Sequence, residues 1–349
     1  MKKEKEILNY TLEELKEEPP FRAEPAYRAG QVFSAINRRT AAGFEAMPGL
    51  SQKLARELGK RFVISTLSCA EHLVSPKDGT EKFLWKLKDG NHVETVLIKG
   101  KARKTLCLSA QVGCRFGCPF CASGSQGFIR DLETAEIVNQ VLCVRRMKKF
   151  RITNVVFMGM GEPLDNYDNV EKAVRIINHP EGIDLGARKI TISTCGIVPG
   201  IRRLSEIGLQ IELSVSLHAA NNELRDELVP VNREYPLEVL IPACQEFSRA
   251  MGRVVTLEYT VIRGKNDSLK DAEDLARIAG KLGAKVNLIA LAEGMDPKTD
   301  RTGHKRMQAF RDRIRSKKVT VTVRKSKGKD ILAACGQLAA EYRREAVSS

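Results

Sequence analysis

Apolar residues recur at helical spacing over the first 60 residues, in ILNYTLEEL, YRAGQVFSAI and LSQKLARELG. Because residues three and four apart share one face of a helix, this region is predicted to be helical. From residue 61 to about 98 the pattern changes to short alternating runs, separated by the turn signals KDG (77–79) and KDGN (88–91). Alternation with a period of two, broken by tight turns, predicts antiparallel β-strands.

After residue 104, short apolar runs alternate with amphipathic stretches of helical period. The runs at 105–111, 152–160, 189–196, 211–219, 254–262 and 285–291 are predicted strands, and the stretches at 133–149, 167–178, 200–207, 237–251, 268–282 and 303–316 are predicted helices. This rhythm predicts a parallel sheet covered by helices, either an incomplete barrel or a doubly wound sheet. A seventh run, VTVTVRK, and a last predicted helix (331–343) close the chain.

These patterns divide the chain into three parts. An N-terminal helical accessory domain is expected over residues 1–60 and a β-hairpin extension over 61–104. The α/β barrel is expected over 105–349, including the C-terminal strand and helix. If this is a barrel, its chemistry belongs at the carboxyl ends of the strands, which is where the candidate motifs lie.

Composition and charge narrow the class of protein. The chain has 349 residues and is 42% hydrophobic and 29% charged, which is ordinary for a globular protein. The start, MKKEKEILNYTLEELKEE, lacks the apolar core of a signal peptide, and no apolar run approaches the length of about 18 residues that a membrane span needs. We therefore expect a cytoplasmic chain that does not enter a membrane.

The net charge of +15 favours a polyanionic partner. Basic residues cluster in KGKARK (99–104), in RRMKK (145–149) and over 311–329, and such clusters attract nucleic-acid phosphates. A solvated basic surface explains the same clusters equally well. Aromatic residues make up only 5%, which argues against a sheet that stacks bases on several rings.

Nine cysteines in a chain of this kind are not expected to form structural disulfides, because the cytosol keeps thiols reduced. Cys69, Cys143, Cys195 and Cys244 each stand alone among apolar or small neighbours and are interpreted as small buried side chains. Three others are tightly clustered.

Cys114, Cys118 and Cys121 form a C-x3-C-x2-C loop directly after the first strand of the barrel. Three thiolates on one loop can hold three corners of a cubane iron–sulfur cluster and leave one iron open. Zinc would need a fourth ligand, and no Cys or His lies near in sequence. With its aromatic residue before the last Cys, this loop resembles the signature of radical S-adenosylmethionine (SAM) enzymes. The resemblance implies that the open iron binds SAM, whose reductive cleavage yields a 5′-deoxyadenosyl radical.

The stretch GMGEP (159–163) ends the second strand of the barrel. Its glycines permit close approach of the backbone to a ligand, and its carboxylate can accept hydrogen bonds from an ammonium group. By itself such a turn is a common way to end a strand. After the cysteine loop, in the order that radical SAM proteins use, it supports a SAM site.

Longer stretches sharpen the resemblance. TLCLSAQVGCRFGCPFCASGSQGFIRDL, TNVVFMGMGEPLDN, SVSLHAANNELRDELVPVN and DILAACGQL together resemble the RlmN/Cfr family of radical SAM RNA methyltransferases, over residues 20 to about 342. The resemblance implies a partial (βα)6 radical SAM barrel with an N-terminal helical and β-hairpin accessory region. It also implies a [4Fe–4S] cluster on the three clustered cysteines and SAM as cofactors.

Two further cysteines match functional positions of that family. Cys335 matches the residue that carries a methyl group taken from one SAM, and Cys107 matches the residue that resolves the protein–RNA adduct. The radical from a second SAM abstracts hydrogen from the methyl thioether of Cys335, and the resulting methylene radical adds to the adenine ring. Cys107 then attacks Cys335 and leaves a disulfide that must be reduced again. Arg103 and Lys104 could lower the pKa of Cys107 by their positive charge.

The resemblance assigns roles to other residues as well. Glu94 aligns with the proton acceptor. The residues implied to contact SAM are Gly161, Glu162, Ser193, Ser216, Leu217 and His218. On chemical grounds alone His218 is the weakest of these assignments, because a single histidine at a strand end is more often a structural group. The family's SAM-contacting Asn falls at Ala292 in this chain, so the loop after the sixth strand must hold SAM differently, through Glu293 or the backbone.

The implied reaction is methylation of carbon 2 of an adenine in the peptidyl transferase centre of 23S rRNA, and of an adenine in tRNA. Carbon 2 is electrophilic and has no acidic proton, so a polar methyl transfer does not work there. An electron donor such as flavodoxin or ferredoxin is expected as a partner, and the chain is expected to be a monomer.

Three alternatives remain open from the sequence. Cfr-type methylation at carbon 8 of the same ribosomal adenine uses the same cysteines. A non-catalytic iron–sulfur protein that binds RNA needs neither Cys335 nor Cys107. A radical SAM enzyme acting on a protein or small molecule would bind its substrate without the steep salt dependence of phosphate contacts.

Overall fold

The computed structural model describes residues 5–148, 150–291 and 303–338. Its centre is one ten-stranded sheet with the order β14-β13-β12-β11-β10-β9-β6-β5-β4-β3. The strands of this sheet are β3 (Ser68–Val74), β4 (Glu81–Lys86), β5 (His92–Lys99), β6 (Lys104–Cys107), β9 (Asn154–Phe157), β10 (Ile190–Thr194), β11 (Glu212–Ser216), β12 (Thr256–Val261), β13 (Lys285–Ala290) and β14 (Val321–Arg324). Two small pairs stand apart, β1 (Lys5–Glu6) with β2 (Phe62–Val63) and β7 (Gln111–Gly113) with β8 (Phe128–Asp131).

Neighbours from β6 to β14 pair in parallel, and β3 to β6 pair in antiparallel fashion. The expected β-hairpin extension therefore continues the sheet of the barrel through the β5–β6 pair. The seventh apolar run forms β14, a further parallel strand. The fold is thus the predicted α/β barrel, open between its last strand and the hairpin.

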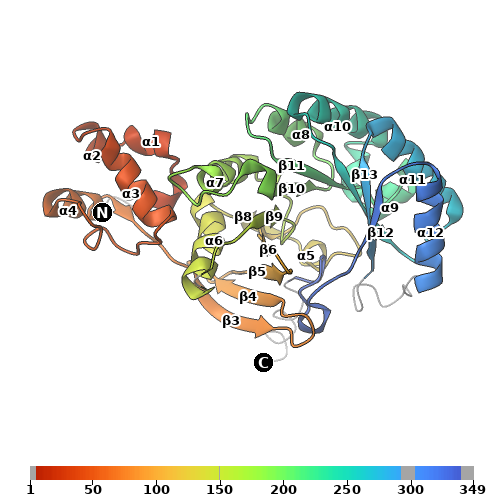
Figure 1. Ribbon diagram of the computed structural model, residues 1–349, viewed down its shortest axis with the longest axis horizontal. Coiled ribbons are helices and arrows are strands. Elements are labelled where there is room, and N and C mark those ends of the chain that lie inside the picture. The colour runs from red at the N-terminus through yellow and green to blue at the C-terminus, as the bar shows by residue number, and fades with distance from the viewer. Residues whose placement is uncertain (1–4, 149, 292–302, 339–349) are drawn as a thin grey trace.

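Helices cover the outer side of the parallel strands (Figure 1). They are α6 (Thr134–Lys148), α7 (Tyr167–Asn178), α8 (Val198–Ser205), α10 (Leu237–Met251), α11 (Leu269–Leu282) and α12 (His304–Ser316). The shorter α5 (Ala122–Ser125) and α9 (Asn222–Leu228) lie in the loops that follow the strands. Local signals fix their ends. Ser268 caps α11 in a reciprocal hydrogen-bonded box with Asp271, and Gly283 ends that helix in the left-handed conformation. The 3-10 turns are η1 (Ile7–Asn9), η2 (Ala187–Lys189), η3 (Pro230–Arg233) and η4 (Lys329–Ile331).

The N-terminal helices gather at one end of the molecule (Figure 1). They are α1 (Leu12–Lys16), α2 (Pro19–Arg22), α3 (Tyr27–Asn37) and α4 (Gln52–Gly59). Arg145 of α6 donates to the carbonyl oxygens of Asn37 and Arg38, each at 3.0 Å. These carbonyls lie at the end of α3, where a helix leaves its last acceptors unpaired and carries partial negative charge. The arginine therefore fixes the helical region to the barrel.

A buried carboxylate ties the hairpin to α6. Glu81 of β4 is 2% exposed and pairs with Lys99, Lys148 and His72 at 2.5, 2.5 and 2.7 Å. Burial alone would raise the pKa of Glu81, but the hydrogen bonds from Lys148, Lys99 and His72 outweigh it and lower the pKa to about 2.

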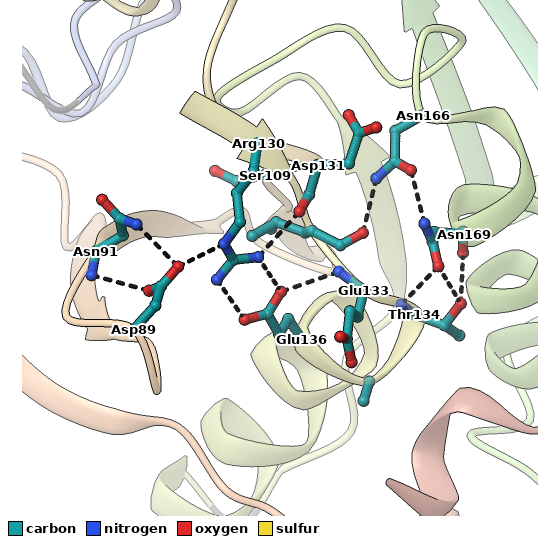
Figure 2. Close-up of polar contacts among 12 residues, drawn as sticks. Asp89, Asn91, Ser109, Arg130, Asp131, Glu133, Thr134, Glu136, Asn166 and Asn169 are labelled. Atoms are coloured by element: carbon teal, nitrogen blue, oxygen red, sulfur yellow. Dashed lines mark hydrogen bonds and ion pairs between the residues drawn. The ribbon is translucent and has the colours of Figure 1, made fainter. Parts of the chain in front are cut away.

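A second polar network joins the other end of the hairpin to the barrel. Figure 2 shows Arg130 of β8 between Asp89, in the turn after β4, and Glu136 at the start of α6. Hydrogen bonds from Arg130 hold the pKa of Asp89 well below its usual range. Because β8 follows the cysteine loop, this network also fixes one side of that loop.

The predicted last helix is wrong in its described part, and residues 339–343 lie outside the described residues. The chain makes the η4 turn and then continues without helix through Cys335. Leu332 and Gly336 have positive φ angles of 47° and 82°, which interrupt a right-handed helix. The backbone N–H of Ala122, in α5, donates instead to the carbonyl of Gly336 at 2.7 Å. Docking against the cysteine loop outweighs the helical pattern here.

Candidate active site

The cysteine loop connects β7 to β8 and lies beyond the carboxyl end of β6. The N–H of Cys114 donates to the carbonyl of Gly127 at 3.0 Å, and the N–H of Cys121 donates to that of Cys118 at 3.0 Å. All three cysteines line one large cavity, the main cavity, which has about 1120 Å³ of empty space, open solvent included. That is large enough for a cofactor of nucleoside size.

The chemistry of these thiols fits an iron–sulfur cluster. Burial raises the pKa of Cys114 to about 12 and raises those of Cys118 and Cys121, and the neighbouring thiol of Cys121 raises the pKa of Cys114 and Cys118 further. Such thiols lose their protons only to a strongly positive group. Among the described residues, no three His, Cys, Asp or Glu side chains are placed to hold a metal ion together. Each ligand of a cubane binds a different iron, so three spaced thiols suit a cluster better than one zinc ion.

The glycine-rich loop after β9 packs tightly against the strand that leads into the cysteine loop. A Cβ on Gly159 would lie 2.6 Å from the carbonyl oxygen of Leu108. Gly161 has a φ of +87°, and a Cβ there would lie 2.4 Å from the Cβ of Gln111. Only glycine fits these two positions. Because glycine has no side chain, the backbone of the loop itself lines the main cavity there.

Gln111 connects the two loops. Its Oε1 accepts the N–H of Glu162 at 2.8 Å, and its Nε2 donates to Asp131 and Asp165 at 2.8 and 2.7 Å. The carboxylate of Glu162 accepts the N–H of Leu164 at 3.0 Å and that of Cys195 at 2.7 Å. Glu162 therefore holds the loops after β9 and β10 together, and it also lines the main cavity.

The structure brings most of the expected SAM contacts to the main cavity. Ser193 at the end of β10, Ser216 at the end of β11, and His218 all line it. Leu217 does not: it is fully buried in the hydrophobic core, and its carbonyl accepts a hydrogen bond from Arg225. Ala292 lies outside the described residues.

His218 is held in an unusual conformation. Its φ is +56°, which is costly for a residue other than glycine and is often found at functional sites. Its Nδ1 accepts the N–H of Thr260 at 3.0 Å, and its ring meets the edge of Phe120 at 4.9 Å between centroids. Burial, with the charge of Arg225, lowers its pKa to about 3. The ring is therefore neutral and carries its proton on Nε2.

Cys335 lies where two cavities meet. It lines the main cavity, and it also lines a smaller cavity, the side cavity, together with Cys107 at the end of β6. Arg324, the last residue of β14, lines both. Burial raises the pKa of Cys107 to about 12, and the charge of Arg324 acts in the opposite direction. The pKa of Arg324 is itself raised, chiefly by Cys335.

The positive charge near Cys107 thus comes from Arg324 and not from Arg103 or Lys104. Lys104 begins β6, three residues before Cys107, and its ammonium lies 4.2 Å from the ring centre of Phe150. Sequence proximity misled here because a strand carries successive residues away from one another. The curvature of the barrel brings Arg324 to the same cavity as Cys107. The Nη1 of Arg324 lies 3.7 Å from the sulfur of Met158, which directly follows β9.

Glu94 lies in β5, on the face that carries Val96 and Ile98 into the side cavity. Its own side chain is not among those lining either cavity. The carboxylate pairs with the ammonium of Lys82 in β4 at 3.1 Å, and both side chains are 4% exposed. An acid in this position is thus buried beside the site, with a lysine as its partner.

Sequence reasoning missed three charged residues of the site, of which Glu258 and Arg225 are buried. Glu258 in β12 lines the main cavity, accepts a hydrogen bond from Asn287 at 2.8 Å, and has its pKa raised by burial. Arg324 lines both cavities, and Arg225 binds the loops that border the main cavity. The available signal for Glu258 was a lone acid in an otherwise apolar parallel strand, where both faces are normally covered.

This fold and site define a radical SAM protein: a partial barrel with three cysteines on the loop after its first parallel strand and a glycine-rich loop after the next. The family model of the radical SAM superfamily matches residues 108–279. The dual-specificity RNA methyltransferase RlmN of Geotalea uraniireducens is 44% identical over 335 residues, which cover 95% of this chain and 96% of the relative. That of Syntrophobacter fumaroxidans is 43% identical over 338 residues, covering 96% and 98%.

A solved structure agrees. The crystal structure of a radical SAM methyltransferase from Sphaerobacter thermophilus superposes with a TM-score of 0.90 at 42% identity, covering 97% of this chain and 100% of that one. The chain therefore belongs to the RlmN family of dual-specificity RNA methyltransferases, within the radical SAM superfamily, and is an enzyme. Membership implies SAM and an iron–sulfur cluster as cofactors. In the described part of the chain, no helix has the length and apolar character to cross a membrane.

Proposed function

We propose that the chain methylates carbon 2 of adenine in 23S rRNA and in tRNA, with Cys335 carrying the methyl group and Cys107 releasing the product. The observation that carries the proposal is the position of Cys335, between the main cavity with its three clustered thiols and the side cavity with Cys107. A methyl carrier needs access both to the source of the radical and to the thiol that resolves the adduct.

In this proposal Cys114, Cys118 and Cys121 hold a [4Fe–4S] cluster that, with SAM bound and an electron from a donor such as flavodoxin or ferredoxin, supplies a 5′-deoxyadenosyl radical. The backbone of the Gly161 loop borders the space for SAM, and the neutral His218 offers a hydrogen-bond donor there.

The two carrier cysteines act through sulfur chemistry. Cys335 accepts a methyl group from one SAM, and a second SAM serves as the radical source. After the methylene radical has joined the base, the unpaired electron of the adduct would pass back to the cluster. The thiolate of Cys107 then attacks the sulfur of Cys335, so that a sulfur–sulfur bond forms as the sulfur–carbon bond breaks, and the released carbon takes up a proton to become the methyl group. The charge of Arg324 favours the thiolate of Cys107, and Glu94 accepts the proton that the ring carbon loses. A dithiol reductant restores the two thiols.

An anaerobic reaction tests this proposal. The reconstituted protein is incubated with a reductant, methyl-deuterated SAM, and 23S rRNA or tRNA transcripts in separate reactions, and the digested nucleosides are read by mass spectrometry. We expect labelled 2-methyladenosine from both RNAs. Labelled 8-methyladenosine would replace the proposal with the Cfr-type reaction, and product from only one RNA would refute dual specificity.

A cysteine variant tests the roles of the two thiols. Without the resolving thiol, Cys107→Ala should accumulate a covalent protein–RNA conjugate, visible as a shifted band on a denaturing gel, and should release little methylated base. Cys335→Ala should form no conjugate. Cys244→Ala, which removes a buried cysteine of α10 outside both cavities, is the matched control and should behave as the parent protein. A conjugate in the Cys335→Ala protein would contradict the assignment.

A further inference from the structure

Arg225 of α9 is a completely buried cation. Its guanidinium donates to the carbonyl oxygens of Leu217 at 3.2 Å, Cys195 at 2.5 Å and Ser216 at 3.5 Å, and to the side-chain oxygen of Asn232 at 2.8 Å. All of these acceptors are neutral. Within the described residues, no carboxylate forms an ion pair with this arginine.

A buried charge without a counter-charge is costly, because carbonyl dipoles replace only part of its hydration. The nearest acid along the chain, Asp226, accepts a hydrogen bond from the Nδ2 of Asn232 at 2.6 Å. Asn232 therefore separates the carboxylate from the guanidinium. An arginine that served only to bind carbonyls could be replaced by a neutral donor at lower cost, so its charge needs a separate explanation.

The surroundings of Arg225 explain why a charge is needed there. The carbonyls that it binds belong to the ends of β10 and β11, where Cys195 and Ser216 line the main cavity. Cys118 of the cysteine loop and Cys195 pack against the same small apolar cluster. Leu217, whose carbonyl Arg225 binds, precedes His218, and the ring of His218 contacts Phe120 of the cysteine loop at 4.9 Å between centroids.

We propose that Arg225 is the buried counter-charge of the iron–sulfur cluster and raises its reduction potential. The proposal rests on the assignment of the cluster to Cys114, Cys118 and Cys121. A cluster held by thiolates becomes more negative when it is reduced, so a fixed positive charge beside it favours the reduced form. The reduced form is the one that cleaves SAM, and Arg225 thereby makes the cluster accessible to a cellular electron donor.

The test is a redox titration of the reconstituted protein, with the reduced cluster followed by electron paramagnetic resonance. Arg225→Gln keeps hydrogen-bond donors but removes the charge, and we expect its midpoint potential to become more negative. At a fixed potential the ratio of reduced to oxidised cluster should fall about tenfold, which corresponds to about 59 mV for one electron. Arg225→Lys keeps the charge with fewer hydrogen bonds, so its potential should stay close to that of the parent protein while its melting temperature falls.

Arg145→Gln is the matched control, since Arg145 is also bonded to backbone carbonyls but lies in the last turn of α6, at the end of that helix away from the cysteine loop. Its substitution should leave the potential unchanged. An unchanged potential in Arg225→Gln, or equal shifts in the Gln and Lys variants, would overturn the role of the charge. A parent protein that binds no cluster would instead refute the proposed function.

A second variant decides the question if Arg225→Gln fails to take up a cluster. The double substitution N232D/D226N exchanges the amide and the carboxylate, which keeps the net charge and the hydrogen bond between the two side chains. It places a carboxylate beside Arg225 and neutralises its field, so the potential should again become more negative. An unchanged potential in this double variant would refute the proposal.

Discussion

Removing Lys82 should destabilise the protein by taking the counter-charge away from the buried carboxylate of Glu94. The two charged atoms are 3.1 Å apart and both side chains are 4% exposed. At an effective dielectric constant of about 20 their attraction is about 5 kcal/mol, which roughly offsets the cost of desolvating both ions. Breaking such a pair from one side costs about 3–5 kcal/mol, since the desolvation cost of the remaining ion stays. We expect this loss in the free energy of unfolding of Lys82→Met.

A double-variant cycle in urea tests the argument. Glu94→Gln in the Lys82→Met background should recover about 2 kcal/mol, because a neutral amide needs no counter-charge. Methylation should be lost in both variants that lack the Glu94 carboxylate. The methylation rate of Lys82→Met, which keeps that carboxylate, tests whether the ion pair prepares Glu94 as a base. If the two single effects simply add, the side chains do not depend on each other and the reasoning fails.

Three further outcomes follow from the structure. The pKa of Glu81 is lowered to about 2, so its stabilising effect is complete above about pH 4.5 and is lost as the pH falls toward 2. The unfolding free energy of the parent protein should therefore fall more steeply between pH 5 and pH 3 than that of Glu81→Gln, by about 1–2 kcal/mol, since the partner lysines are partly exposed. Gly161→Ala forces a Cβ against Gln111 and should weaken SAM binding at least tenfold in equilibrium dialysis, whereas Gly186→Ala, with open space around it, should not. With a pKa lowered to about 3, the ring of His218 should stay neutral from pH 5 to 8, and a midpoint near 6.5 in its NMR titration would disprove its burial.

The sequence predicted the fold well because the central parallel strands, such as β10, β11 and β12, are largely buried on both faces. Such strands appear as continuous β-branched runs, as in ITIST of β10, and they alternate with amphipathic helices. The cysteine loop was equally visible, since its three ligands are close in sequence. The last helix was predicted wrongly because tertiary contacts, such as that between Ala122 and Gly336, decide the conformation near Cys335.

The site was less predictable where its parts come from distant segments. Arg324 and Cys107 lie at opposite ends of the barrel sequence, and only the curvature of the sheet brings the two side chains together. In the segment NELRDEL, Arg225 resembles an ordinary residue on the exposed face of a helix, because the neighbouring residues do not show that this face of α9 is buried. Leu217 was placed among the SAM contacts by resemblance, yet its side chain belongs to the core. Packing, and not local pattern, determines which of these residues reach the cavities.

The segment that carries Cys335 is fastened on two sides. Ser75 donates to Asp330 at 2.9 Å, and the N–H of Gly328 donates to Asp78 at 2.9 Å, both in the turn after β3, while Gly336 binds the cysteine loop. During synthesis the hairpin and the cysteine loop emerge well before this segment. A nascent chain can thus assemble the parts that would generate a radical while the proposed methyl carrier is still missing. The order of the parts along the chain makes the docking of this late segment the step that completes the enzyme, and a protein synthesised only up to β14 would expose its radical source without a carrier to receive the radical.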